Sequence, residues 1–299
     1  MFRRSFFSLA GGAFSATVLP SFAFSQAPPA VAAPGAPPTP AAFGYSNPQL
    51  EAVLAPIALY PDVLLSQVLM ASAYPAQILE ATRWVQQQPQ RRIHGDDLAR
   101  ASETRNWDPS VKSLLPFPAL LSQLSSNRRW LEQLGYAAAN QQPDVLDAVQ
   151  RLRQRAVAAG SLQTTDQCVV RTEDRVVMID PTASGLVYMP SYNPTIAYGT
   201  WAEPAYPPVY LQPPAGYVFS PVLGGLLAFG AGIAVGALLW DVGRPRWGQR
   251  NIYVNHDRYN AINGHRGVYR GGDVWHPSQT ASYGHGGGWR RPPDGPGGR

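Results

Sequence analysis

The chain has 299 residues, a mass of 32.4 kDa and a formal net charge of +5, with Lys112 as its single lysine. Cys168 is the only cysteine, which excludes an internal disulfide and a cysteine-based metal cluster. A modest positive charge is only a weak argument for a polyanionic partner, so composition leaves most classes of function open.

The first residues predict a targeting segment. The chain starts with MFRRSFFSLAGG, in which Arg3 and Arg4 lead into a moderately apolar run. The paired arginines are typical of a twin-arginine export signal, although an ordinary secretory signal fits the same residues. Small residues at Ala23 and Ser25 predict cleavage before Gln26, with an uncleaved N-terminal anchor as the alternative.

Residues 47–160 show a helical period that aromatic-proline pairs interrupt, and they predict an all-helical unit large enough to bury a core. Asp62 precedes Trp84 by 22 residues, and Asp108 precedes Trp130 by the same interval. This spacing indicates two related helix-turn-helix units packed together. Coincidence in an aromatic-rich helical unit is the alternative.

After residue 160 the pattern changes to short β-branched runs separated by turn residues, at 168–171, 176–179, 186–189 and 195–198. These runs predict a small antiparallel sheet packed on the helical unit. Pro190 and Pro194 would confine its later strands to an edge or a bulge, because proline cannot donate to a strand ladder.

A run of nineteen residues without a charge, Val222 to Trp240, predicts a transmembrane helix within 217–240. Its small residues recur at every fourth position and would form a helix-packing groove for a partner helix or a second copy; they are Gly224, Ala228, Gly232 and Gly236. The alternative is a buried core helix or a pair of apolar strands.

The predicted span also predicts a topology. An exported N-terminus places whatever follows the span on the cytoplasmic side, and Arg244, Arg246 and Arg250 follow at once, in agreement with the positive-inside rule. The remaining tail is rich in arginine, glycine and histidine without an apolar period, so it is expected to be disordered.

The predicted fold class is α+β, with an all-helical N-terminal domain, a small antiparallel β segment, one Gly-rich transmembrane helix and a disordered C-terminal tail. The expected segments are a signal peptide (1–25), a Pro/Ala-rich linker (26–46), the helical domain (47–160), the β segment (161–200), a Pro/Tyr-rich linker (201–216), the transmembrane helix (217–240) and the tail (241–299).

Four runs resemble one bacterial family, catalogued as domain of unknown function 3300. They are LAPIALYPD (54–62), AYPAQILEATRW (73–84), WDPSVKSLLPFP (107–118) and VYMPSYNPTIAYG (187–199). The likeness covers about residues 47–200. The family is regarded as a membrane or cell-envelope protein without an assigned activity, so the resemblance implies a location and no catalytic residues.

An envelope hydrolase is the enzymatic alternative, because paired carboxylates lined by aromatic side chains are what glycan hydrolysis requires. Asp62, Glu80 and Asp108 are its candidates. Helix capping explains both aspartates without catalysis, and Glu80 with Arg83 forms an ordinary i, i+3 pair. No catalytic residue is assigned on this basis.

The tail supplies a further alternative, the binding of a polyanion or a metal. Its histidines, His256, His265, His276 and His285, are separated by nine, eleven and nine residues, which is too far for the close pairs of zinc modules. Arginines with Tyr259, Tyr269 and Trp275 could stack on bases, but no recognised nucleic-acid module is present. No cofactor, metal or nucleic-acid partner is predicted.

The function expected from the sequence is therefore that of an exported, membrane-anchored cell-envelope protein. Its periplasmic helical domain would act as a scaffold or as a binding module for an envelope protein or a wall polymer. Trp107, Trp130 and Tyr192 are aromatic contacts if they are exposed, whereas aromatic residues in such a unit usually belong to the core.

Overall fold

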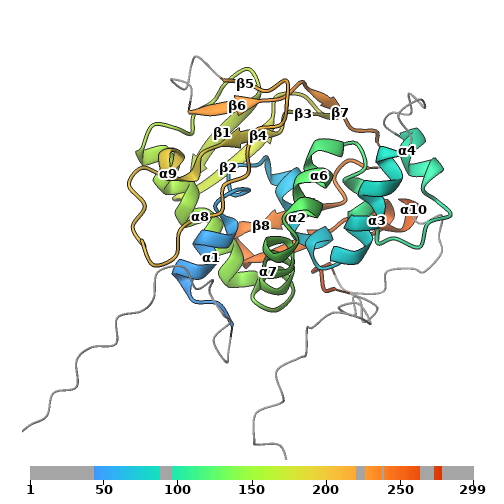
Figure 1. Ribbon diagram of the computed structural model, residues 1–299, viewed down its shortest axis with the longest axis horizontal. Helices are drawn as coiled ribbons and strands as arrows, with labels where there is room; N and C mark the ends of the chain where they lie inside the picture. Colours follow the sequence, from blue (N-terminus) through green and yellow to red (C-terminus); the bar gives the residue numbers. More distant parts are fainter. Residues whose placement is uncertain (1–43, 88–95, 220–225, 238, 263–272, 278–299) are drawn as a thin grey trace, which may run out of the picture. The chain divides into compact units, whose positions relative to one another are not determined.

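The computed structural model describes residues 44–87, 96–219, 226–237, 239–262 and 273–277. The predicted signal peptide lies outside them. Within them helices come first along the chain and short antiparallel strands follow, so the α+β prediction is confirmed (Figure 1).

The helical region begins shortly after Gly44. Its elements are α1 (Asn47–Leu54), α2 (Asp62–Ser72), α3 (Pro75–Gln86), α4 (Asp96–Ala101), α5 (Pro109–Ser113), α6 (Pro118–Ser126), α7 (Arg128–Asn140) and α8 (Gln142–Ala158). Proline starts α3, α5 and α6, where its missing N–H is not needed. Gly160, with φ of +73°, follows the end of α8.

The two helix pairs α2–α3 and α5–α6 pack with equivalent helices in contact, α2 against α5 and α3 against α6. Asp62 is the first residue of α2, and the Asp108 side chain caps α5 by accepting from the Ser110 N–H at 2.9 Å. The arrangement agrees with two related helix-turn-helix units. It also places an aspartate at the start of each pair, with Asp62 as the first helical residue and Asp108 as the N-cap residue.

The connection between α1 and α2, residues 55–61, is buried without forming a regular element, so its backbone groups need partners. Two tyrosine hydroxyls supply them. Those of Tyr192 and Tyr198 both donate to the Ala55 carbonyl, at 2.9 and 2.7 Å, and that of Tyr192 accepts from the Leu59 N–H at 3.1 Å. Both tyrosines belong to the strand region, so the two regions share one interior.

A hairpin of β1 (Cys168–Glu173) and β2 (Val176–Pro181) opens the strand region. Its two loop residues, Asp174 and Arg175, both have positive φ, as the tight turn of a two-residue hairpin requires. The hairpin is joined to α8 by Gln150, whose side chain accepts from the Val177 N–H at 2.8 Å and donates to its carbonyl at 3.1 Å.

The next strands form one bulged antiparallel ladder. Its members are β3 (Leu186–Val187), β4 (Pro190–Tyr192), β5 (Val218–Phe219), β6 (Leu227–Phe229) and β7 (Ile233–Ala234), and the short helix α9 (Pro194–Ala197) follows β4. β4 pairs with β6 and β3 with β7, with three residues, 230–232, opposite two, 188–189. This extra residue is a β-bulge. β5 pairs with the other edge of β6.

The prediction of a transmembrane helix over 217–240 is wrong. The described residues of that segment form β5, β6 and β7, and no helix in the described part of the chain is long and apolar enough to cross a bilayer. Strand β6 is buried at all three of its residues, and a strand buried on both faces reads as a continuous hydrophobic stretch. The alternative of paired apolar strands is the better description.

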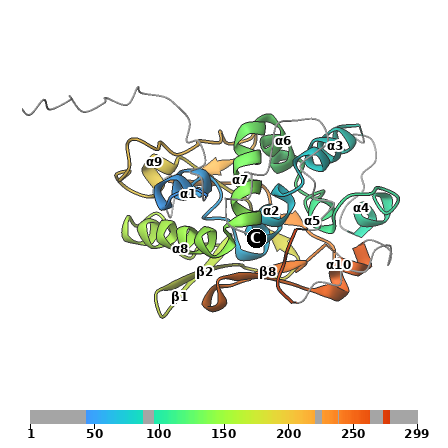
Figure 2. The same ribbon diagram turned by 90° about the horizontal axis from the view of Figure 1, so that it is seen from below.

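The expectation of a disordered tail from residue 241 is wrong for its first part. That part contains β8 (Gly243–Arg246), the 3-10 turn η1 (Trp247–Gln249), β9 (Asn251–Val254) and α10 (His256–Ile262). β8 packs on α2 and α10 packs on α5 (Figure 2). These partners lie far away in sequence, so a local apolar period does not reveal them.

Candidate functional site

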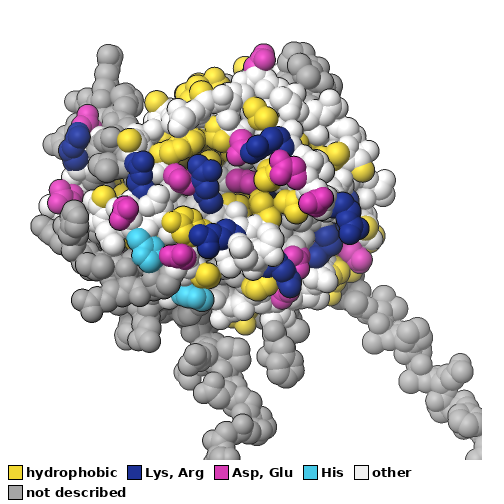
Figure 3. Space-filling view, turned by 180° about the vertical axis from the view of Figure 1, so that it is seen from behind, with side chains coloured by type: hydrophobic (Ala, Val, Ile, Leu, Met, Phe, Trp, Pro, Cys, Tyr) yellow, Lys and Arg dark blue, Asp and Glu magenta, His cyan; other side chains and the backbone are white. Residues whose placement is uncertain are grey.

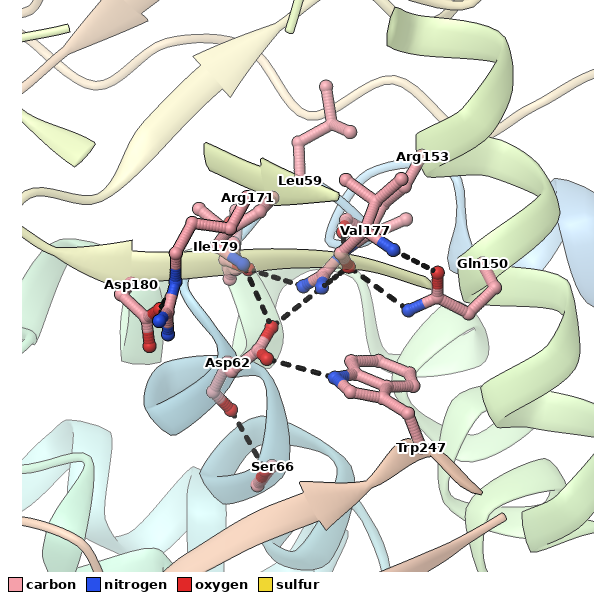
Figure 4. A network of polar contacts seen from close by, with 12 residues as sticks. Leu59, Asp62, Ser66, Gln150, Arg153, Arg171, Val177, Ile179, Asp180 and Trp247 are labelled. Atoms are coloured by element: carbon pink, nitrogen blue, oxygen red, sulfur yellow. Dashed lines mark hydrogen bonds and ion pairs between the residues drawn. The ribbon is translucent and has the colours of Figure 1, made fainter. Parts of the chain in front are cut away.

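A buried arginine forms the main polar centre of the fold (Figure 4). The side chain of Arg153, on α8, is fully buried. Its guanidinium donates to the backbone carbonyls of Ala58 (2.8 Å), Tyr60 (2.9 Å) and Val177 (2.8 Å). It also donates to the Asp62 carboxylate, at 2.6 Å from Oδ1. Arg153 thus supplies hydrogen bonds to buried acceptors in the α1–α2 connection, in the first residue of α2 and in the β hairpin. This role is structural, because buried polar groups need such partners.

Asp62 has a second partner from the far end of the chain. Trp247 Nε1 donates to its Oδ2 at 3.0 Å, and the Trp247 ring lies against Arg153, with the guanidinium carbon 4.9 Å from the ring centroid. Burial raises the pKa of the Asp62 carboxyl, while the charge of Arg153 and the Trp247 hydrogen bond act in the opposite direction.

Asp108 occupies a second, separate centre. Its carboxylate accepts from the Ser110 hydroxyl at 2.5 Å and from the Tyr259 hydroxyl at 2.6 and 2.7 Å. Burial raises the pKa of Asp108, and the hydroxyl donors only partly offset that effect. Tyr259 belongs to α10, so each aspartate at the start of a helix pair is bound by an aromatic side chain of the C-terminal segment.

The three carboxylates of the hydrolase alternative do not form one site. Glu80 accepts from Trp107 Nε1 at 3.0 Å, beside the Asp108 centre, whereas Asp62 lies in the Arg153 centre, and the two centres share no side chain. Each carboxylate is already engaged by donors of the fold. The arrangement resembles two structural anchors more than an acid and a base facing a common substrate.

An apolar groove of about 560 Å³ lies between the helix pairs and the bulged ladder. In Figure 1, β3 and β7 lie above α6. One wall contains the backbone from Gly230 to Ala234, and the other is built from helical residues and their connections. Among the described residues the lining includes Trp84, Leu98, Phe117, Pro118, Tyr217 and Ile233, and it contains no charged residue.

The predicted helix-packing residues take other positions. Gly224 lies outside the described residues. Ala228 is buried in β6, Gly232 is exposed in the bulge beside the groove, and Gly236 accepts backbone hydrogen bonds from Leu239 and Trp240. Because the chain is extended from 227 to 234, a spacing of four does not place these residues on one helix face.

Sequence reasoning missed the groove and both partners of the aspartates. From the sequence, Phe117-Pro118 indicates a break between helices and gives no sign of a groove. Trp247 and Tyr259 fall in the segment that the sequence predicts to be disordered. One local signal was present: Gly230 and Gly232 are two residues apart, which is the period of a strand and not of a helix.

The tail alternative rests largely on residues outside the described ones, including His265, His285 and Tyr269. His256 lies 4.0 Å from Asp273. On the face shown in Figure 3, basic and acidic side chains alternate. That face therefore lacks the single-sign field that draws polyanions to a protein.

These features define an α+β protein with two buried polar centres, around Arg153 and around Asp108, and with a groove whose described lining is uncharged. The chain matches the family model described as "Protein of unknown function (DUF3300)" over residues 46–277, and it belongs to that family. The match confirms the resemblance seen in the four runs. It also extends beyond them, through the bulged ladder and into the C-terminal segment.

The chain is similar to the uncharacterised protein YacH of Escherichia coli (strain K12). The two are 40% identical over 224 residues, which make up 64% of this chain and 36% of YacH. The matched region thus spans about a third of the length of that relative. No solved structure matches the chain.

Proposed function

We propose that this protein is exported to the cell envelope and that its folded unit binds an uncharged partner in the groove. The groove supports the binding role. Its volume of about 560 Å³ falls within the range of about 300 to 1,000 Å³ that ligand sites occupy. Its described lining is almost entirely apolar, as is usual for ligand sites.

The chemistry of the groove favours an envelope protein over a wall polymer. Sugar and anionic polymers are recognised through hydrogen-bonding and charged groups, whereas the polar side-chain atoms among the lining residues are those of Trp84 and Tyr217. Aromatic and aliphatic side chains are typical of the centre of protein interfaces. We therefore assign the binding-module role to a protein partner.

Export is supported by the N-terminal sequence. Arg3 and Arg4 precede an apolar run, and small residues at Ala23 and Ser25 precede a proline-rich stretch. Because β8 and α10 pack on the helices, the whole described unit would be exported together. The envelope is the compartment in which the groove would meet its partner.

The binding role is tested with the purified full chain and Nile red, an uncharged apolar dye whose fluorescence rises in an apolar site. Ala231→Asp places a charge at the groove wall and should weaken dye binding at least tenfold, because ionised groups oppose an apolar ligand. Ala202→Asp is the matched control at an exposed site outside the groove lining. Equal binding by the two variants would contradict the role of the groove.

Export is tested separately, by intact-mass measurement of the protein recovered from fractionated cells. The expected result is an envelope-fraction protein that begins near Gln26. A chain that retains Met1 and stays in the cytosolic fraction would overturn the proposal. Replacement of both arginines by lysine should block export only if the twin-arginine route is used.

A further inference from the structure

We propose that the groove takes an extended, uncharged polypeptide segment, which adds as a strand along the backbone edge from Gly230 to Ala234. The inference rests on the proposed binding role of the groove and names the class of its occupant.

The first observation is an edge that the described strands cover at one end only. The run from β6 to β7 is paired along one side by β4 and β3, whereas on its other side, within the described residues, β5 pairs with Ala228 and Phe229 alone. Before β5 the chain turns away: the Tyr217 N–H donates to the Pro214 carbonyl at 3.4 Å, and Gly216 has φ of +85°. The position in line with β5 is therefore left to the groove.

The second observation is the direction of the backbone groups. The Val235 N–H donates to the Gly185 carbonyl at 2.8 Å, and hydrogen-bonded and non-bonded pairs alternate in an antiparallel ladder. The alternation turns the N–H and C=O of Ala234 away from β3. Ala231, Gly232 and Ala234 are exposed, so the outward groups can be reached by a further strand.

The third observation is that two glycines, Gly230 and Gly232, leave this edge without side chains. A Cβ on Gly230 would lie 2.9 Å from the ring of Tyr217, and one on Gly232 would lie 2.9 Å from the ring of Tyr188. Glycine at both positions lets the rings pack on the bulge. The residue between the two glycines, Ala231, has only a methyl side chain. Another backbone can therefore approach this edge closely.

The fourth observation concerns the side chains that a partner strand would meet. Its residues would alternate between the apolar groove wall, which includes Phe117 and Trp84, and solvent. Beyond the groove the same edge stays apolar, because Val218 and Phe219 are 71% and 57% exposed. An uncharged segment with apolar residues at alternate positions fits this surface, and strand addition is a common mode of peptide recognition.

The exposed backbone edge distinguishes a polypeptide from a lipid chain. A hydrocarbon chain gains nothing from N–H and C=O groups and would leave them without partners. A peptide backbone pairs with them and gains affinity from the same groups.

The test uses the full chain as the target for a phage-displayed library of random nine-residue peptides. Selected peptides are resynthesised with N-methyl groups at alternate residues, on one edge of the strand or on the other. Strand addition predicts that methylation of one edge weakens binding at least tenfold and that methylation of the other does not. Tolerance of methylation on both edges would overturn it.

Two variants of the protein test strand addition without any change to the peptide. Ala234→Pro removes the outward N–H, which an edge strand tolerates, and should abolish peptide binding while Nile red binding remains. Ala234→Thr keeps the N–H and should bind the peptides as the parent does. Thermal melts confirm that both variants fold.

The outcomes separate this inference from the function on which it rests. If Nile red binds the groove but no peptide is enriched over an Ala231→Asp target, strand addition is wrong and the binding role stands. Displacement of Nile red by decanoate but not by selected peptides would identify a lipid chain as the occupant and overturn the inference. Loss of specific dye binding would remove the binding role itself.

Discussion

At the scale of single residues, the Arg153 centre gives the largest expected effects. Asp62→Asn removes the only carboxylate among the described hydrogen-bond partners of a fully buried guanidinium. Because an uncompensated buried charge is left behind, the free energy of unfolding should fall by about 3 to 5 kcal/mol. Denaturant unfolding of the purified protein measures this.

Asp180→Asn is the matched control, since Asp180 pairs with Arg171 on the surface, where the arginine is 54% exposed. Exposed pairs contribute about 0 to 1 kcal/mol. Similar losses from the two substitutions would show that the Asp62 pair is no stronger than a surface pair.

Asp108 should make the free energy of unfolding fall as the pH rises, whereas the carboxylate of an ordinary salt bridge makes it rise. Its pKa is raised in the folded protein, so the folded state holds the proton more tightly than the unfolded state, where the reference value is 3.8. Stability contributed by this group therefore falls as the pH rises from about 4 through the raised pKa. Relative to Asp108→Asn, the parent should lose unfolding free energy over that interval.

Urea unfolding of both proteins across the pH range checks the sign, because all other titrating groups are common to the pair. A difference that stays constant, or that grows in favour of the parent as the pH rises, would contradict a raised pKa at Asp108.

These two residues also show what the sequence could predict at this scale. Asp108 caps α5, as its local pattern predicts, because capping involves neighbours in the chain. The expectation of a cap is wrong for Asp62, which is the first residue of α2 and whose carboxylate binds Arg153 and Trp247 instead. The aromatic partners of the two aspartates, Trp247 and Tyr259, are 185 and 151 residues away, and nothing local indicates such contacts.

At the scale of elements, close helix packing depends on one glycine. Gly135, in α7, faces the end of α2, where an added Cβ would lie 2.1 Å from the Ser72 carbonyl oxygen. Alanine stabilises an exposed helix by about 1 kcal/mol relative to glycine, but here the clash with backbone should reverse the sign. Gly135→Ala is expected to lower the unfolding free energy by about 1 to 3 kcal/mol.

The control for this prediction is Gly248→Ala, where an added Cβ meets nothing within 4 Å. Thermal unfolding of the two variants and the parent makes the comparison. A Gly135→Ala protein as stable as the parent would mean that α2 and α7 are not in such close contact.

The elements predicted least well were those whose partners are distant. Helices α2, α3 and α8 followed from their own period and from the prolines and glycine at their ends. The apolar run near residue 230 was read as a membrane helix because its length and small residues fit one. Its strand partners, β3 and β4, lie about forty residues earlier in the chain, and a short apolar run cannot be assigned to strand or helix by its period alone.

At the scale of the whole molecule, the strand and C-terminal regions complete the interior of the helical region. Arg153 needs the Val177 carbonyl, and the buried Ala55 carbonyl needs hydroxyls from Tyr192 and Tyr198. The groove likewise exists only where the bulged ladder meets the helices.

The same dependence predicts how fragments behave. A fragment of residues 47–160 has the helical pattern, but it lacks every donor from the strand and C-terminal regions to the α1–α2 connection, Asp62 and Asp108. Buried polar groups left without partners cost about 1 to 3 kcal/mol each, so the fragment should show no cooperative helical melt by circular dichroism. A fragment of residues 44–277 should melt cooperatively. If 47–160 alone gives a sharp helical transition, the helical region is an independent domain and the shared interior described here is not required for folding.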